Sequence, residues 1–338
     1  MASLLNANVA YNTWKSYQGT LARLHKLEKK HSLDLSLPWS SSSKALNYVL
    51  ALDADGLKPS SIENYLSAIK MAHKAFGFPI VIDRDILNPV LKGMDNLQEA
   101  NPPRRLAVTP AILKLIRNQL KKQKWTILYK RMIWCACLFL FWSCCRSAEL
   151  FAPSCSKMVA STTFRANQVG CHAGLIDGLN VNWMELTLKN TKEMKNSSKK
   201  ATSVELFPTG NFLCPIDAFR KFKRIVTDWD ESLPLFRIGK VFLTQKQFNC
   251  DLRLLLSEHF DYAAKSVSSH SFRAGISTAM ARCGFSDEEI KLQGRWSSDA
   301  FSRYIRQARS IRLSAQKKIS EAMAAISCDE PYRPIIVA

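Results

Sequence analysis

The sequence predicts a mainly α-helical protein with a small antiparallel β-sheet, divided into two domains. Three observations point to this fold class. Over residues 9–98, apolar residues recur every three or four positions, which is typical of amphipathic helices. A basic segment with paired prolines, 101–107, then breaks every pattern. Beyond it, helical stretches surround one run of alternating residues, 179–188, which is typical of a β-strand.

The first predicted domain, residues 1–100, is a bundle of helices. Its first helix carries one apolar face, and a serine-rich stretch separates it from the second. Ser60 and Glu63 have the spacing of a capping box, so we expect Ser60 to be the N-cap of a third helix that ends at Gly77. A short helix at about 85–94 closes the bundle.

The second predicted domain, 108–338, follows the linker 101–107. Thr109 and Pro110 suit the N-cap and the first position of its first helix. A very apolar helix at 129–145 is shorter than the roughly 20 residues that cross a bilayer, so we expect a buried core helix and no membrane span. Its four cysteines are expected to be buried thiols.

Two strands, 179–188 and 202–207, are predicted to form a hairpin whose lysine-rich loop spans 189–200. A further stretch, 236–244, is short and partly extended. The remaining helices are expected from Pro215 and at 245–259, 270–283, 286–292 and 299–306, followed by an amphipathic helix, 310–326, within a carboxy-terminal tail, 310–338.

The charge balance indicates a polyanionic partner. Among 338 residues, Lys and Arg total 48 against 28 Asp and Glu, a formal net charge of +20. Such an excess is typical of proteins that bind nucleic acid, although a basic surface that only aids solubility has the same composition. The amino terminus lacks the basic and apolar regions of a signal peptide. Cys171 and His172 have no second ligand pair at finger spacing, so we predict no metal site.

The last third of the chain concentrates side chains that suit phosphate chemistry. His270 and Arg273 lie one helical turn apart, and Trp296 and Tyr304 follow. A phosphodiester under attack gains negative charge, so it needs fixed cations, hydrogen-bond donors and an in-line nucleophile. Arg146, upstream, supplies a further guanidinium. This set indicates an enzyme that cuts and joins DNA with a tyrosine nucleophile.

Each of these residues also has a plain structural explanation. We expect Arg146 and Arg273 to clamp two phosphate oxygens and to favour the phenolate form of Tyr304. Taken by itself, Tyr304 is more simply explained as a half-buried tyrosine at a helix end. His270 is expected to accept the tyrosine proton or to bind a phosphate oxygen. Trp296 can donate its indole N–H to the phosphate, and its alternative is a core tryptophan.

A lysine and a glutamate complete the predicted site. Lys192, in the hairpin loop, is expected to reach over the site and to protonate the departing sugar oxygen. Glu149 is expected to orient Arg146 or its neighbours, unless it is an ordinary exposed helix residue. Any single lysine in this loop is more simply explained as a solvated charge. Three other lysines, Lys189, Lys195 and Lys199, are also candidates for the proton donor.

Four basic residues outside this set are predicted DNA contacts. Lys70 and Lys74 lie off the apolar stripe of the third helix. Arg104 and Arg105 lie in the linker, whose extended, basic character suits a nucleic-acid backbone.

The ordered motifs resemble the tyrosine recombinases, also called the phage-integrase family. The motifs are Arg146-x-x-Glu149-Leu150, the hairpin Lys192, His270-x-x-Arg273, Gly294-Arg-Trp296 and Tyr304. The string Gly294-Arg-Trp-Ser-Ser-Asp-Ala-Phe-Ser-Arg-Tyr-Ile-Arg306 looks most like the recombinases of eukaryotic DIRS-type retroelements. The resemblance covers nearly the whole chain, because 9–98 is similar to the family's helical core-binding domain.

The resemblance implies a site-specific recombinase or integrase that needs neither cofactor nor metal. Tyr304 would form a 3′-phosphotyrosyl bond and release a 5′-hydroxyl, and a second strand's 5′-hydroxyl would reverse the step. Four subunits would act on two DNA duplexes through a Holliday junction at inverted-repeat or junction sites. Each would close on DNA as a C-shaped clamp and dock its tail helix, 310–338, on a neighbour. A eukaryotic retroelement protein would work in the nucleus, and other members in the cytoplasm or nucleoid.

The chain departs from the family pattern in two places. Counting back from Tyr304 puts Arg295 at the family's His/Trp position, whereas counting forward from Arg273 puts Trp296 there. We favour Trp296 because indole is an accepted donor at that place. The long stretch between Arg146 and Lys192 predicts an insertion in the sheet.

Three rival functions remain. A monomeric DNA-relaxing enzyme like a type IB topoisomerase shares the chemistry, but the amphipathic tail at 310–326 favours assembly. A non-catalytic DNA-binding descendant conflicts with the complete residue set. A basic RNA-binding module conflicts with the lack of aromatic sheet motifs.

Overall fold

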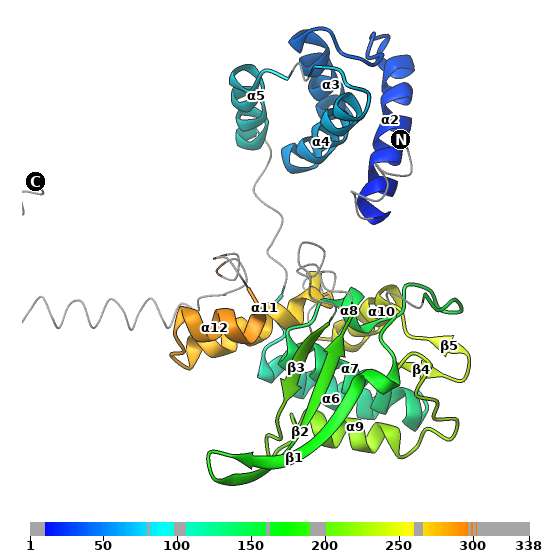
Figure 1. Cartoon of the computed structure of the whole chain (residues 1–338), viewed down its shortest axis with the longest axis vertical. Coiled ribbons are helices and arrows are strands. Elements are labelled where there is room, and N and C mark those ends of the chain that lie inside the picture. Colours follow the sequence, from blue (N-terminus) through cyan, green and yellow to red (C-terminus); the bar gives the residue numbers. More distant parts are fainter. Residues whose placement is uncertain are drawn as a thin grey trace, which may run out of the picture. The chain divides into compact units, whose positions relative to one another are not determined.

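The computed structural model describes residues 11–79, 82–97, 106–159, 163–189, 201–259, 266–296, 299 and 302. The chain divides into two compact units, Met1–Pro102 and Pro103–Ala338, and each is considered by itself. The first unit is helical, and the second combines helices with a small antiparallel sheet (Figure 1). The predicted fold class, mainly α with a small antiparallel sheet, is therefore confirmed.

The first unit contains four described helices, α2 (Tyr11–His31), α3 (Ser42–Ala54), α4 (Pro59–Ala75) and α5 (Arg84–Leu97). Their apolar stripes meet in one buried cluster, as the three-and-four periodicity predicts. Trp39, in the connection between α2 and α3, lies at its centre. Its ring packs edge-on against Tyr48 at 5.4 Å, and its backbone N–H donates to His73 Nε2 at 3.1 Å.

The predicted N-cap of the third helix is wrong. Helix α4 begins at Pro59 and its N-cap is Lys58, two residues before Ser60. The reason is that proline favours the first helical position, where its fixed φ is already helical and no N–H is needed. Glu63 instead forms a two-pronged ion pair with Arg84 of α5, at 2.7 and 3.0 Å. The predicted end holds, since Gly77 adopts φ +73 just beyond α4.

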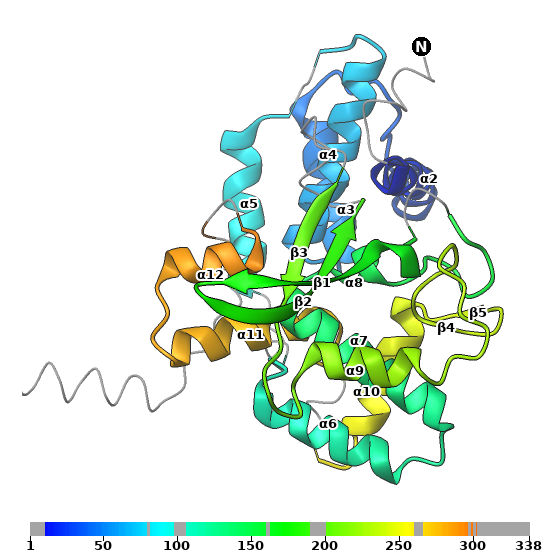
Figure 2. The same ribbon diagram turned by 60° about the horizontal axis from the view of Figure 1, so that its bottom comes forward.

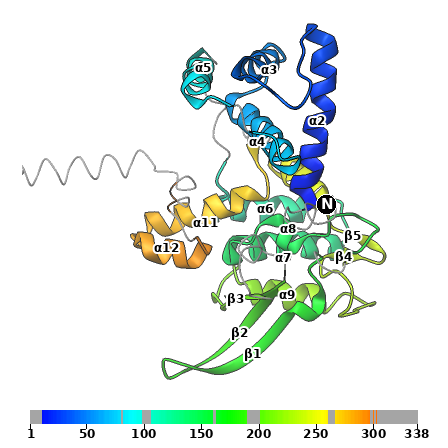
Figure 3. The same cartoon turned by 45° about the horizontal axis from the view of Figure 1, so that its top comes forward.

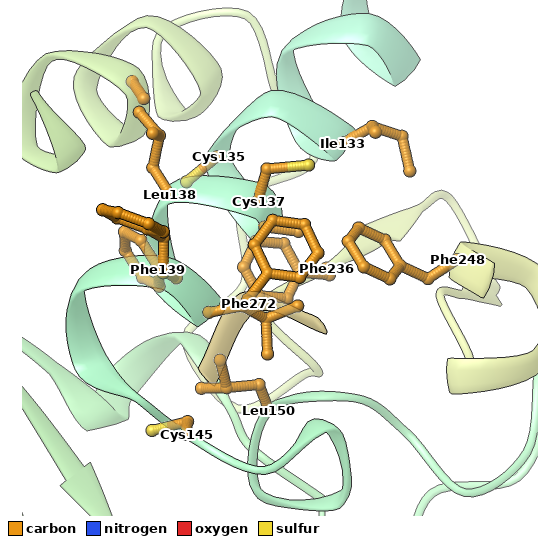
Figure 4. Packing of buried hydrophobic residues seen from close by; sticks show 14 of the residues in the cluster. Ile133, Cys135, Cys137, Leu138, Phe139, Cys145, Leu150, Phe236, Phe248 and Phe272 are labelled. Carbon is orange, nitrogen blue, oxygen red and sulfur yellow. The ribbon is translucent and has the colours of Figure 1, made fainter. Parts of the chain in front are cut away.

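The second unit is built round helix α7 (Ile127–Ser143), whose residues from 135 to 141 are all buried. Phe139, Phe236, Phe248 and Phe272 pack near one another in this core (Figure 4). The cysteines of the apolar helix are buried, as predicted. The helix ends at Ser143, two residues before the predicted end, because Cys144 adopts a left-handed conformation, φ 51.

The other helices of this unit are α6 (Pro110–Lys122), α8 (Ser147–Leu150), α9 (Pro215–Lys223), α10 (Gln245–Leu256), α11 (His270–Arg282), α12 (Asp287–Gly294) and the 3-10 turn η1 (Ala166–Gln168). Thr109 is the N-cap of α6 and Pro110 its first residue, as predicted. Helices α6, α9 and α11 all contact α7, which is therefore the central helix of the unit (Figure 2). In the part of the chain that the structure describes, no helix is long and apolar enough to span a membrane.

The main sheet has three antiparallel strands in the order β1 (Val169–Ile176), β2 (Leu179–Leu188) and β3 (Thr202–Leu206). Strand β3 pairs only with residues 184–188, so β1 and the outer part of β2 continue as a two-stranded ribbon (Figure 3). A second sheet pairs β4 (Arg237–Ile238) with β5 (Val241–Phe242). Strand β1 was not predicted, and it takes up part of the long stretch before the lysine-rich loop.

Some predicted features lie outside the described residues. These are most of the linker, the loop 190–200, most of the helix expected at 299–306 and the tail 310–338.

Candidate active site

Arg146 lies where the central helix gives way to the short helix α8. Cys144 turns the chain after α7, and Arg146 becomes the N-cap of α8. The carboxylate of Glu149 accepts the Arg146 backbone N–H at 2.9 Å and its Nη1 at 3.0 Å. The Glu149 side chain is only 3% exposed, so it is not an ordinary surface glutamate. Its contacts fix both the backbone and the guanidinium of Arg146.

Arg273, on helix α11, is almost fully buried. Its Nη1 donates to the carbonyl oxygen of Cys144 at 2.5 Å, and its Nη2 donates to that of Gly294 at 3.3 Å. The guanidinium therefore ties together the ends of α7 and α12. Because Cys144 is two residues before Arg146, these bonds bring the two predicted phosphate-clamping arginines into one region of the fold.

His270 is the first residue of α11 and is exposed, one turn before Arg273. The turn that leads into the helix is fixed by Asn249 of α10, whose Oδ1 accepts the backbone N–H of Ser269 at 2.8 Å. His270 is thus exposed at the first position of a helix, and the turn before it is held by this hydrogen bond.

Arg295 and Trp296 leave the end of α12 in different directions. Arg295 has a left-handed backbone, φ 54, and its Nη2 lies 3.0 Å from Glu149 Oε2 and 3.6 Å from Cys145 Sγ. The Trp296 ring centroid lies 4.7 Å from Arg273 Cζ, a cation–π contact. Any Cβ on Gly294 would come within 1.5 Å of the indole. Glycine is therefore required for Trp296 to lie over Arg273.

The site is electrostatically positive. Arg146 and Arg295 both pair with the carboxylate of Glu149, and Arg273 bonds to the Cys144 carbonyl two residues before Arg146. Burial raises the pKa of Cys144 and of Cys145 to about 12, even though the nearby arginines act in the opposite direction. Both thiols stay neutral near pH 7 and do not offset the arginines. Clustered guanidinium groups attract an anion.

Several predicted residues cannot be placed at this site. Lys192 and Tyr304 lie outside the described residues, as do Lys195, Lys199, Arg104 and Arg105. Lys189 is exposed at the end of β2. In the first unit, Lys70 is half-buried and Lys74 exposed on α4. The described ranges contain no group of three or more His, Cys, Asp or Glu residues that could hold a metal ion.

Sequence reasoning missed two features of the site. The backbone carbonyls that hold Arg273 have no sequence signal, because any residue type supplies a carbonyl. The joint contact of Arg146 and Arg295 with Glu149 was also missed. Its only signal is the count back from Tyr304, which puts Arg295 at a site position.

Solved structures with a similar fold are site-specific recombinases and integrases. The XerH recombinase bound to palindromic difH substrate has a TM-score of 0.57 at 12% identity, covering 88% of this chain and 76% of that one. The Tn1549 transposon integrase bound to transposon right end DNA also has a TM-score of 0.57, at 15% identity, covering 95% and 96%. A λ integrase dimer bound to a COC′ core site has 0.51 at 13% identity, covering 90% and 74%.

The fold is that of the tyrosine recombinases. Neither the scan against protein-family models nor the search of curated proteins found a match. At identities this low, the likeness establishes the recombinase fold, and the chemistry must be argued from the site residues of this chain.

Proposed function

We propose that the protein is a site-specific tyrosine recombinase that cuts and rejoins double-stranded DNA. The observation that supports this most strongly is the arginine cluster around Glu149 and Trp296. It gathers residues from α8, from α11 and from the segment just after α12 at one place in a recombinase fold. Both predicted phosphate-clamping arginines belong to it, and the exposed His270 begins the helix that carries one of them.

In the proposed reaction, Tyr304 attacks a DNA phosphate. The P–O5′ bond breaks and a P–O bond to the tyrosine forms, so the 3′ end becomes linked to protein. His270 accepts the tyrosine proton or binds a phosphate oxygen, and Arg146 and Arg273 offset the charge that develops on phosphorus. Lys192 donates a proton to the leaving 5′ oxygen. One ester replaces another, so the bond energy is retained for the reverse step with a second strand.

The finer details are also proposals. We infer that the protein serves a mobile element of the DIRS-type retroelement kind, working in the nucleus if its host is eukaryotic. Lys70, Lys74, Arg104 and Arg105 contact DNA, and four subunits exchange their tails, 310–338. The mass of the complex on a paired DNA site separates this assembly from a topoisomerase-like monomer.

Removal of the Tyr304 hydroxyl tests the proposed function. We expect Tyr304→Phe to abolish covalent protein–DNA adducts on a nicked suicide substrate while DNA binding is retained, because only the nucleophilic oxygen is lost. Adducts are resolved on a denaturing gel, and binding is measured by mobility shift with the same DNA. An adduct that persists in the variant would place the nucleophile elsewhere.

A further inference from the structure

We propose that Arg295 is a third phosphate-binding arginine of this site, and that Trp296 is a positioning residue for Arg273 and not a phosphate donor. This inference rests on the proposed function. It assigns separate roles to the two neighbouring residues that the sequence left as alternatives for one place.

Arg295 lies beside Arg146. Glu149 Oε1 accepts from Arg146 and Glu149 Oε2 accepts from Arg295, each at 3.0 Å. One carboxylate thus holds two guanidiniums next to each other. Their side chains remain 28% and 18% exposed, whereas that of Glu149 is 3% exposed. Both arginines reach the surface, while the acid that aligns them lies behind.

Two positive charges lie close together in this arrangement. Two guanidiniums held next to each other repel each other. A phosphate that binds across both guanidiniums offsets that repulsion. Planar guanidiniums also match the oxygens of a phosphate better than other cations do. The pair is therefore arranged before DNA binds for the charge that develops when phosphorus is attacked.

The backbone of Arg295 has an unusual conformation. A residue other than glycine with φ 54 is disfavoured, and such conformations persist mainly where surrounding contacts impose them. Here the left-handed turn sends the Arg295 side chain to Glu149 while the next residue, Trp296, covers Arg273. A helical continuation of α12 would not separate the two side chains in this way.

The Trp296 ring packs closely against its neighbours. Its indole lies over the guanidinium of Arg273 and against Gly294, and it contacts the core of the second unit. Arg273 beneath it is 2% exposed. The ring fixes the plane of that guanidinium, a task that needs an aromatic face and no N–H donor.

A DNA substrate with an uncharged scissile phosphate tests whether Arg295 binds the phosphate. A methyl group replaces one non-bridging oxygen of the scissile phosphate, and the rate of adduct formation is measured on this methylphosphonate and on normal DNA. We expect Arg295→Ala to slow adduct formation on the order of 10²-fold on normal DNA and only a few-fold on the neutral substrate, since there is less charge to offset. Both rates come from one preparation, so partial misfolding cancels in their ratio.

Equal losses on the two substrates would show that Arg295 acts only structurally and would overturn the inference. Arg295→Lys, which keeps the charge, should lose less than Arg295→Ala on normal DNA. Arg224→Ala, which removes an exposed arginine at the end of α9, is the matched control and should lose little on either substrate. If the unsubstituted protein forms no adduct with normal DNA, the proposed function itself fails, which is a different result.

Two variants test Trp296. Trp296→Phe keeps an aromatic face over Arg273 but has no N–H, and it should react within a few-fold of the unsubstituted protein. Trp296→Ala loses the face and should be much slower. If Trp296→Phe is as slow as Trp296→Ala, the indole N–H is required and the positioning role is wrong.

Discussion

Gly294 shapes the site because glycine has no side chain. It ends α12, its carbonyl accepts from Arg273, and its Cα faces the Trp296 indole. These contacts connect the local backbone to the guanidinium that is proposed to meet phosphate. The same region shows why Glu149 is buried, since its carboxylate lies between two arginines that come from distant parts of the chain.

We predict that Gly294→Ala displaces Trp296 and lowers the free energy of unfolding by about 1–3 kcal/mol, because the added Cβ lies 1.5 Å from the ring. Adduct formation should slow as well, since Arg273 loses its cover. Denaturant unfolding and the suicide-substrate gel measure the two effects. Gly93→Ala, in α5, is the control, because its Cβ meets nothing within 4 Å. Equal stability of the Gly294 variant and the parent would contradict the packing described.

At the scale of elements, α11 is positioned by backbone contact with the segment before α6. The Val108 N–H donates to the Ser271 carbonyl at 2.9 Å, and a Cβ on Gly275 would lie 1.9 Å from the Val108 carbonyl oxygen. Glycine thus lets two stretches of backbone touch. This contact sets the position of the helix that carries both His270 and Arg273.

Gly275→Ala should therefore destabilise the second unit by about 3 kcal/mol or more, at the upper end for overpacking, because backbone cannot rotate away as a side chain can. Calorimetric unfolding of the whole chain measures the loss. Gly19→Ala, inside α2 with nothing within 4 Å of the added Cβ, should instead raise stability by about 0.5–1 kcal/mol. A Gly275 variant as stable as the Gly19 variant would refute the close approach.

Sequence patterns predicted most elements because burial imposes their periodicity. Strand β2 occupies the predicted range 179–188, and α11 starts at His270 as expected. Strand β1 was missed because Gly170 and Gly174 weaken its strand pattern and its outer end is exposed on both faces, so burial imposes no alternation. Ser60 was misassigned because two local signals competed and the proline prevailed.

The residue types of the site were predictable, whereas their partners were not. Arg146, Glu149, Arg273 and Trp296 were all expected at one place, and the structure brings them together. The pairing of Arg295 with Glu149 joins residues 146 positions apart. Such a contact depends on how α12 ends and packs, which no local pattern specifies.

At the scale of the whole molecule, the net charge of +20 is the property that bears most on the proposed binding of DNA. Phosphate contacts by lysine and arginine release condensed counterions, so affinity falls with salt in proportion to their number. A recombinase that tracks a DNA backbone makes many such contacts. In the proposed function, the arginine cluster supplies some of these phosphate contacts.

We predict that DNA affinity falls on the order of 10³-fold between about 50 and 200 mM salt, as expected for roughly six or more phosphate contacts. Fluorescence anisotropy with a labelled duplex gives the slope. Tyr304→Phe should show the same slope, since it changes no charge. A flat response would contradict backbone binding through Lys and Arg.

The most direct test of the account is to map the covalent bond. The protein is reacted with a nicked suicide duplex, digested with trypsin and nuclease, and the nucleotide-bearing peptide is sequenced by mass spectrometry. The account predicts a 3′-phosphate-linked nucleotide on the peptide that contains Tyr304 and on Tyr304 itself. Attachment at any other residue, or to a 5′ phosphate, would contradict it.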